Sequence, residues 1–308
     1  MDDAALSGWL RLREQRDWRA RSGGLTQAIV ATLPHDRPVG VLDLASGAGS
    51  NLRYLAERLP MHQRWLLIDR SATLVSEVQS RTMAWAAARG YAVNLSARQE
   101  MGFSSEASAE GTRAAQEFSI AGPHLDCHVE MRVQDLGALD EPSLFAGRHL
   151  VTASALFDLV SEAWLRRLAS CCRTAGASAL FTITYDGRFT CDPAESEDER
   201  VRTLMNRHQG RDKGLGGPAE GPGAAACAAR CFTDEGYRVT MEGSDWVLGP
   251  GDAAMQQTLI DGWAEAAFAV SPGDAQRIAL WRVRRLAHVD AGISHLVVGH
   301  QDVAAWRE

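Results

Sequence analysis

Apolar positions along the chain alternate between two patterns: the spacing of a helix and the short apolar run of a buried strand. Residues 6–33 carry apolar side chains at helical spacing among charged ones, and Pro34 ends that stretch. A short apolar run, VGVLDLA (39–45), leads into a glycine turn, SGAGS, and then an amphipathic stretch, NLRYLAERL. The run RWLLID (64–69) and the helical pattern after it repeat this order. Alternating strands and helices predict an α/β fold with a parallel sheet covered on both faces.

The later segments supply the rest of this fold. Residues 91–126 lose all periodicity and are rich in Ser, Ala, Glu and Gly, so we expect an insertion there. Residues 195–209 are acidic first and basic last, which favours a helix. Further strands are expected in CHVEMRVQDL (127–136), HLVTASALFDLV (149–160) and ASALFTITYDGR (177–188), with a terminal antiparallel pair in YRVTMEGSDWVL and SHLVVGHQDVAAW.

These elements predict a Rossmann-like, doubly wound, mostly parallel sheet of seven strands with helices on both faces. The chain divides into four expected parts. They are an N-terminal helical segment (1–38), a ligand-binding α/β core with its insertion (39–190), a substrate lid (191–234), and C-terminal strands with a helix that complete the core (235–308).

Composition narrows the class of protein. The chain is 45% hydrophobic and 23% charged, with a net charge of −7 and no basic patch, which disfavours a nucleic-acid surface. No apolar run reaches transmembrane length, and the acidic start is unlike a signal peptide. The six cysteines form no CxxC pair, so we expect reduced thiols and a cytoplasmic protein. Cys227 and Cys231 could share a metal, but no further His or Cys is near in sequence, and we expect no metal.

The glycine turn after the first strand is the strongest site motif. Gly47 and Gly49 would let the backbone approach a ligand closely. A dinucleotide fingerprint would need glycine at position 52, where the chain has Leu52, and no phosphate-binding loop occurs. Instead, acidic residues end successive strands at Asp43, Asp69 and Asp135. A turn with nearby acids can also be turn chemistry alone.

At these motifs the chain resembles the class I S-adenosylmethionine-dependent methyltransferases. The resemblance covers about residues 39–188, through VLDLASGAGSN, LLIDRS, VQDL and the fourth and fifth strands. It implies S-adenosylmethionine as cofactor and S-adenosylhomocysteine as product. It also implies the cofactor-binding residues, which are Asp43, Ala45, Gly47, Gly49, Asn51, Asp69, Arg70, Asp135, Leu136 and Ala153. WLRLREQRDWRARS, and TYDGR through SDWVL, are similar to a bacterial small-molecule subgroup, a likeness that names no substrate.

Methyl transfer requires a rigidly held donor, a nucleophile and often a base, and the candidates lie at strand ends. We expect catalytic roles for Asp158, Tyr185 and His208. Expected substrate-binding residues are Ser154, Asp186, Asn206, Arg207, Arg211, Lys213 and Asp245. Ordinary alternatives stay open: Ser154 and Asp158 can cap a helix, Tyr-Asp-Gly can form a plain turn, and His208 can complement a helix end.

Lys213 is the one lysine among 32 basic side chains. It lies near Arg207 and Arg211 in a glycine-rich stretch of an acidic chain, so we expect these cations to hold an anionic group. A solvated surface turn is the alternative. The sequence therefore predicts methyl transfer to a small anionic or amino-acid-like metabolite. Alternatives are a cofactor-binding enzyme of cyclisation or elimination, and a non-catalytic partner subunit; a homodimer or a small partner chain is compatible with either.

Overall fold

The structure is a computed structural model that describes residues 2–95, 116–137, 139 and 141–307. Its strands are β1 (Val39–Leu44), β2 (His62–Asp69), β3 (Ala92–Leu95), β4 (Gln116–Gly122), β5 (Leu125–Val133), β6 (Leu150–Ser154), β7 (Ser178–Asp192), β8 (Arg238–Gly243), β9 (Trp246–Leu248) and β10 (His295–Trp306). Its α-helices are α1 (Asp3–Ala20), α2 (Gly23–Val30), α3 (Ser50–Leu55), α4 (Ala72–Ala87), α5 (Glu162–Ala175), α6 (Asp198–Gln209), α7 (Ala224–Asp234), α8 (Ala253–Val270) and α9 (Ala275–Asp290).

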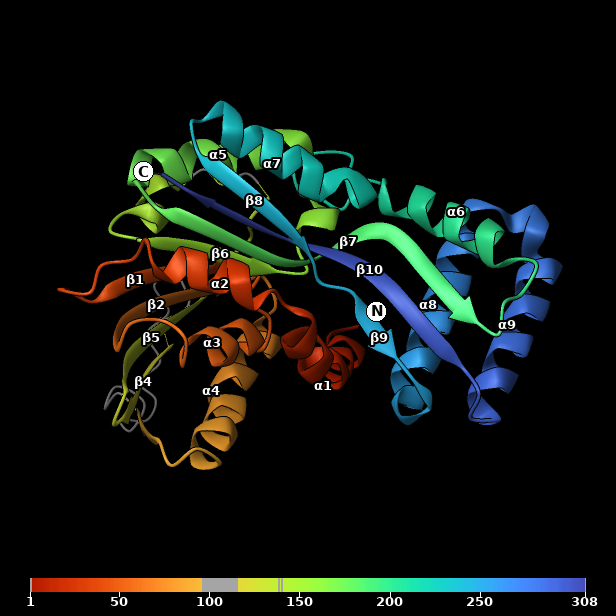
Figure 1. Cartoon of the computed structure of the whole chain (residues 1–308), viewed down its shortest axis with the longest axis horizontal. Coiled ribbons are helices and arrows are strands. Elements are labelled where there is room, and N and C mark those ends of the chain that lie inside the picture. Colours follow the sequence, from red (N-terminus) through yellow and green to blue (C-terminus); the bar gives the residue numbers. More distant parts are fainter. Residues whose placement is uncertain (1, 96–115, 138, 140, 308) are drawn as a thin grey trace, which may run out of the picture.

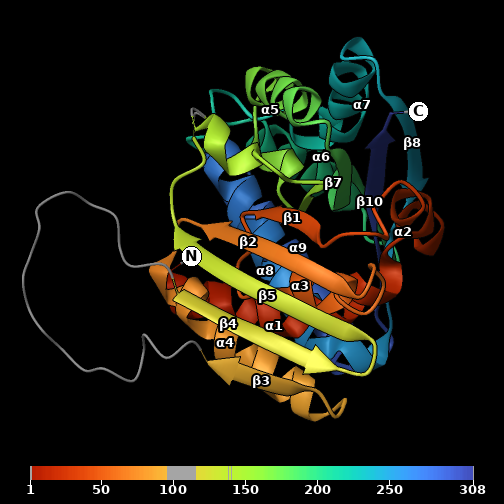
Figure 2. The same cartoon turned by 90° about the vertical axis from the view of Figure 1, so that its left-hand side faces the viewer.

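One twisted sheet organises the molecule (Figures 1 and 2). The strands are ordered β3-β4-β5-β2-β1-β6-β7-β10-β8, and β9 pairs with β10. Successive strands from β5 to β7 pair in parallel. Outside them, β4 is antiparallel to β5, and β10 is antiparallel to β7, β8 and β9. Counted in chain order, the parallel strands have the spatial order 3-2-1-4-5 of a doubly wound sheet. The predicted fold class is confirmed, and the switch in strand order lies between β1 and β6.

Apolar side chains alternate between the two faces of the sheet because successive strand residues point to opposite sides. Leu42 and Leu44 of β1 pack with α5 and α7, whereas Val41 packs with α2, α3 and α4. Figure 1 shows these two sets of helices on opposite sides of the strands. The N-terminal segment predicted as helical is two helices, because the chain turns at Arg21 and the Ser22 side chain accepts from Leu25 N to begin α2.

The predicted insertion at 91–126 contains more regular structure than its composition suggested. Its ends form β3 and β4, an antiparallel pair that extends the sheet beyond β5, and residues 96–115 lie outside the described residues. Phe118 and Ile120 of β4 are buried and lie two residues apart. The C-terminal end of this segment therefore carries the two-residue apolar period of a strand. Together with β9, this pair raises the number of described strands above the seven expected.

A third packed cluster lies at the far ends of β7 and β10, with α6, α8 and α9 (Figure 1, right). The sequence predicted a single helix after residue 235 that would complete the core, whereas α8 and α9 pack in this separate cluster instead. Helix α7, which falls inside the predicted lid, packs against the sheet. The four-part division of the chain stays a prediction. No helix in the described part of the chain is long and apolar enough to cross a membrane.

A buried ion pair ties α9 to the start of α6. Arg285 is fully buried, and its Nε and Nη2 atoms donate to the Asp198 carboxylate at 3.0 and 2.7 Å. The Trp281 indole N–H donates to the same carboxylate at 2.7 Å. On the same helix, Arg282 forms a half-exposed pair with Asp261 at 2.6 Å.

We expect Arg285→Ala to lower the free energy of unfolding by about 3–5 kcal/mol, because it leaves Asp198 without its buried cation. The matched variant Arg282→Ala should cost about 0–1 kcal/mol, because its pair is solvated. Urea unfolding of the two variants measures both effects. Equal losses would contradict the assignment of Arg285 as the link between the two helices.

Candidate functional site

The glycine turn lies at the carboxyl edge of the sheet, between β1 and α3. Gly47 has φ of +53°, and a Cβ atom there would lie 3.1 Å from the Leu10 side chain of α1. Gly49 has φ of +79°, and its Cβ would meet Val78 of α4 at 3.0 Å. Both positions therefore favour glycine. Gly47 faces the site beneath α1, whereas Gly49 lets the turn pack against α4.

Asp69 ends β2 and holds this turn. Its carboxylate oxygens accept hydrogen bonds from the backbone N–H groups of Gly47, at 2.8 Å, and Ser71, at 2.9 Å. Burial raises the pKa of Asp69, and these two bonds oppose the shift. A carboxylate has about four acceptor positions, so Asp69 keeps capacity for further donors.

Asp43, at the end of the central strand β1, is fully buried. Its Oδ1 accepts from the Asn51 amide at 2.8 Å, and its Oδ2 has no hydrogen-bond partner among the described residues. Burial raises the pKa of Asp43 to about 7. Buried polar atoms normally have partners, so an unpartnered carboxylate oxygen marks a place for a donor or a cation.

The cavity beside Asp43 is small because α1 covers it. It has a volume of about 40 Å³ and is lined by Leu10, Arg13 and Asp17 of α1 together with the glycine turn. Two wider hollows follow along the same edge of the sheet. One, of about 460 Å³, includes Arg70 and Asp135, and the other, of about 470 Å³, includes Asp135 and Leu136.

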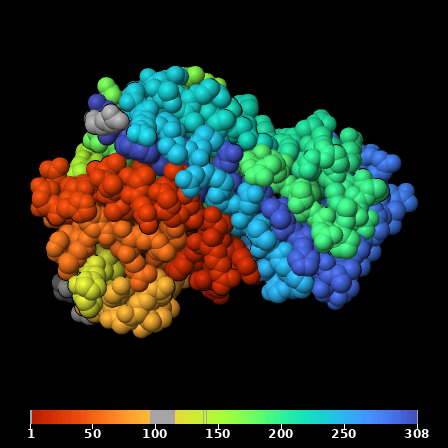
Figure 3. Space-filling view, viewed as in Figure 1, coloured from red at the N-terminus to blue at the C-terminus, as the bar shows by residue number. Residues whose placement is uncertain are grey.

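Helix α1 is fastened across this edge along its whole length. Figure 3 shows the N-terminal residues, in red, filling the space between the orange and the blue parts of the chain. The fastening contacts are Ser71 to Asp3 (2.7 Å), Ser7 to Glu77 (2.8 Å), Arg53 to Glu14 (2.8 Å) and Trp18 to Ser50 (3.1 Å). Nothing in the amino-acid pattern indicated that this helix would lie over the site.

Arg21, just after α1, reaches the centre of the site. It is buried, and its guanidinium donates to Asn51 Oδ1 at 2.7 Å and to Ser154 Oγ at 2.9 Å. The guanidinium also lies 4.5 Å from the centre of the Tyr54 ring, within cation–π distance. Sequence reasoning missed Arg21, because an arginine in a helical N-terminal segment has no motif that marks it as buried.

Ser154 and Asp158 do not share a helical face, and neither caps α5. Ser154 ends β6, Asp158 lies in a short 3₁₀ helix (Phe157–Leu159), and the Ser161 side chain caps α5. Ala153, also of β6, is buried in the core. Asp158 is buried, which raises its pKa to about 6, while the positive charges of Arg13 and Lys213 oppose the shift.

Tyr185 of β7 and Asn206 of α6 contact each other. The Tyr185 hydroxyl donates to Asn206 Oδ1 at 2.9 Å, and the Asn206 amide donates to the Gly187 carbonyl at 2.9 Å. Burial raises the pKa of Tyr185 well above its ordinary value, so its hydroxyl stays protonated.

Asp186 and Asp245 both bind Arg188 of β7. Both carboxylates were predicted to bind substrate, and in the structure they share this cation. The reason is that the turn after β8 brings Asp245 beside β7 and β10, where its carboxylate also accepts from His300 N at 3.0 Å.

The three cations of the glycine-rich stretch point to different neighbours. Arg211 donates to the Ala269 carbonyl of α8 at 2.7 Å, and Arg207 is exposed on α6. Lys213 Nζ lies 3.4 Å from the His208 carbonyl, and Asp158 is near enough to oppose the lowering of the Lys213 pKa by burial. Burial and the charges of Lys213 and Arg211 lower the pKa of His208. Of the three cations, Lys213 is the one coupled to Asp158.

His300 of β10 is a further residue that the sequence did not indicate. It is buried opposite Tyr185, its ring centre lies 4.4 Å from that of Trp246, and its Nδ1 has no partner in the described part of the chain. Burial and the charge of Arg13 lower its pKa to about 3, so the ring is neutral. A histidine inside a strand pattern carries no signal that separates it from a packed one.

The sheet and its edge define a Rossmann-like α/β protein with a candidate ligand site at the switch in strand order. The glycine turn and Asp43 line its small cavity, Asp135 lines the two wider hollows, and Asp69 holds the turn, at the positions that the resemblance to class I methyltransferases implies. The predicted resemblance is confirmed at the level of the fold.

No family model and no curated protein matches the sequence. Similar solved structures include the YcgJ protein from Bacillus subtilis (11% identity, TM-score 0.43, covering 93% of this chain and 100% of that one). Another is the cyclopropane synthase MmaA2 from Mycobacterium tuberculosis (12%, TM-score 0.41, 91% and 82%). A third is the geranyl diphosphate C-methyltransferase from Streptomyces coelicolor (13%, TM-score 0.40, 92% and 78%). These TM-scores are below 0.5, so the fold class rests on the strand order and register of the sheet itself.

We expect Asp43→Asn to change the pH dependence of stability without ligand. The folded-state pKa of Asp43, about 7, lies above its ordinary value of 3.8, so the wild type loses stability as pH rises between these values. Asparagine does not ionise, so the variant should not lose stability over that range. The melting temperature of the variant minus that of the wild type should therefore rise with pH over that range and stay constant above about pH 7. A difference that does not change with pH would contradict a buried, unpartnered carboxyl.

Proposed function

We propose that this chain is a class I S-adenosylmethionine-dependent methyltransferase that acts on a small, anionic or amino-acid-like metabolite. The observation that carries the proposal is the Asp43 carboxylate, whose buried Oδ2 has no described partner beside the Gly47 turn. Asp69 lies on the next strand, at the same edge. A cofactor with an ammonium group at one end and a ribose diol further along matches this sequence of acceptors.

The residues present fit this cofactor in kind. Asp43 would receive its ammonium group, Asp69 its ribose hydroxyls, and Asp135 with Leu136 its adenine. The two wider hollows along the edge have the volume of ordinary small-molecule sites, which is about 300–1,000 Å³. When bound, S-adenosylmethionine supplies a methyl group activated by a sulfonium.

The ammonium end of the cofactor can enter only if α1 moves, because Leu10 lies against Gly47 and the cavity there has a volume of about 40 Å³. The contacts at the start of α1, from Ser71 to Asp3 and from Ser7 to Glu77, are exposed or partly buried, so they can be exchanged for water at modest cost. The second half of α1 is held more firmly, because Glu14 and Asp17 bind the buried side chains of Arg53 and Trp246. In this proposal α1 opens for the cofactor and then closes over it, which excludes water from the reacting groups.

Asp158 is the proposed base on the substrate side. Its pKa of about 6 lies close enough to neutral pH to accept a proton from an acceptor hydroxyl or amine. Tyr185 with Asn206, and the neutral His300, would orient the acceptor through hydrogen bonds. Lys213 would hold an anionic group of the substrate beside Asp158.

The alternatives with the same pocket are a reaction other than methyl transfer, and a non-catalytic subunit. A screen of small anionic metabolites by thermal shift with the cofactor would find substrates. Accumulation of S-adenosylhomocysteine with a substrate supports methyl transfer. Conversion of the substrate without that product would favour cyclisation or elimination, and binding without conversion would favour a subunit.

The affinity for S-adenosylmethionine should rise with pH up to about 7. The ammonium group favours ionised Asp43, so below the Asp43 pKa binding must first release a proton. Asp43→Asn should weaken binding at least ten-fold near neutral pH and remove this dependence, because a charge-assisted hydrogen bond is worth about 1.5–3 kcal/mol. Calorimetric titration at several pH values measures both. Wild-type affinity in the variant would reject the proposed cofactor contact.

We expect Lys213→Ala to lower kcat/KM at least ten-fold while cofactor affinity stays unchanged, because a charged hydrogen bond to the substrate is lost. Lys213→Arg should restore only part of the activity if the loop accommodates a compact cation and not a fork. Arg200→Ala, an exposed residue of α6 that pairs with Asp274, is the control and should leave kcat/KM unchanged. Full activity in Lys213→Ala would exclude a substrate contact.

A further inference from the structure

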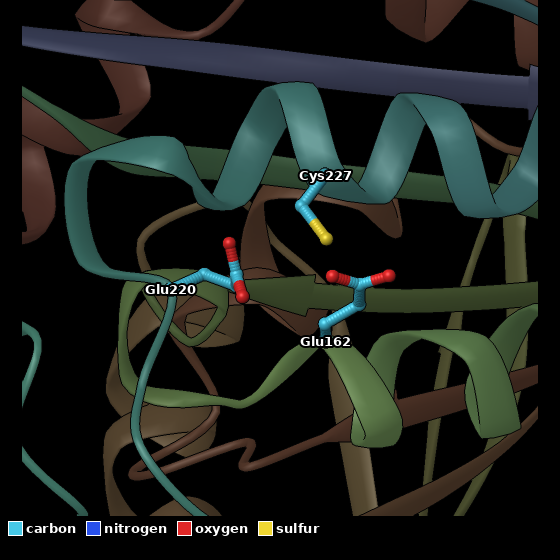
Figure 4. A group of neighbouring side chains, drawn as sticks. All are labelled: Glu162, Glu220 and Cys227. Carbon is cyan, nitrogen blue, oxygen red and sulfur yellow. The ribbon is translucent and has the colours of Figure 1, made fainter.

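Three potential metal ligands meet behind the substrate-side loop, away from the glycine turn. Glu162 begins α5, Glu220 directly precedes the short 3₁₀ helix Gly221–Gly223, and Cys227 lies in α7. Their ligand atoms all lie within 4.8 Å of one another. Figure 4 shows the Cys227 sulfur pointing toward the space between the two carboxylates. The thiol is 1% exposed, and both glutamates are half-buried.

The charges of this cluster are not balanced within the described part of the protein. Both hydrogen bonds from Arg166 go to Glu162 Oε1, at 2.9 and 2.6 Å, and Oε2 has no hydrogen bond among the described contacts. Arg166 is largely exposed and also pairs with Asp234. The Glu220 carboxylate has no hydrogen bond or ion pair among the described contacts. Two carboxylates therefore face one buried thiol, with one exposed cation to compensate them.

A second thiol is in reach. Cys231 lies one turn further along α7, in hydrogen-bond contact with Cys227 and near the charge of Glu162. The sequence had suggested Cys227 and Cys231 as a pair and rejected a metal because no His or Cys partner was near. Folding adds two carboxylates instead: Glu162 comes from a distant part of the chain, and Glu220 lies in the loop just before α7.

We propose that Glu162, Glu220 and Cys227 bind a divalent cation of the zinc class, with Cys231 or water as the fourth ligand. Zn–S and Zn–O bonds of about 2.3 and 2.0–2.2 Å give tetrahedral ligand separations of roughly 3.5 Å. Closing from 4.8 Å to that spacing requires shifts of about 1 Å, which half-buried glutamate side chains can make by rotation. Sulfur favours zinc over magnesium or calcium, which prefer all-oxygen sites. The Cys227 proton leaves to solvent on binding.

A cation here would fix the substrate-side loop to its support. The loop that carries Lys213 is fastened by two backbone hydrogen bonds, from Ser161 N to the Leu215 carbonyl at 3.2 Å and from Glu220 N to the Val160 carbonyl at 2.8 Å. Glu220 is thus the point where the loop meets α5 and α7. The site stabilises this junction, so it acts on loop order and not on the cofactor pocket.

The test uses the full-length chain, reduced and freed of metal by chelation, with Co²⁺ as a spectroscopic probe and Zn²⁺ as its competitor. We expect one Co²⁺ per chain with sulfur-to-cobalt charge-transfer absorption, displacement by Zn²⁺, and a higher melting temperature with Zn²⁺. Glu220→Gln and Cys227→Ala should each weaken Zn²⁺ binding at least ten-fold. The control Cys171→Ala, which removes a thiol of α5 outside the cluster, should bind like the wild type.

Absence of Co²⁺ and Zn²⁺ binding to the wild type would overturn the proposal, and so would wild-type affinity in Glu220→Gln. Glu220 is half-buried on a loop, so this variant keeps the test valid if Cys227→Ala does not fold. The readout needs neither cofactor nor substrate, so its result is independent of the proposed methyl transfer.

Discussion

The arrangement of the site depends on one buried polar network at the end of the central strand. Asn51 donates to Asp43 of β1 and to Thr152 of β6, and its carbonyl oxygen accepts from Arg21. Because these groups are buried, each lost hydrogen bond leaves a partner without compensation. The network therefore fixes the first helix, the glycine turn and two neighbouring strands relative to one another.

In the proposed function, that network would let the site be closed and still admit the cofactor. Arg21 belongs to this network and anchors the end of α1, whereas the start of α1 is held by polar contacts that are exposed or partly buried. Movement of α1 about this anchor would open the cavity at Gly47 without disturbing Asn51. In the closed position α1 also places Arg13 near Asp158 and His300, where its charge lowers the pKa of both.

The fold could be predicted from the sequence because its signals are local. Buried parallel strands such as Val39–Leu44 are continuous apolar runs, and acidic residues at their carboxyl ends must share one edge of the sheet. The missing parts depend on distant contacts. Helices α8 and α9 could equally have covered the sheet, and only the long β7 and β10 strands give them a separate surface. Arg21, His300 and the pairing of Glu162 with Glu220 carry no local pattern, because tertiary structure alone makes them neighbours.

The central claim is that the edge beneath α1 binds S-adenosylmethionine and that α1 moves to admit it. Hydrogen–deuterium exchange of the full chain, with and without saturating S-adenosylhomocysteine, tests both parts in one measurement. The account predicts slower exchange at the glycine turn and around Asp69 and Asp135, together with a changed rate across α1. Exchange that is unchanged at these segments under saturating ligand, or changed only elsewhere, would contradict it.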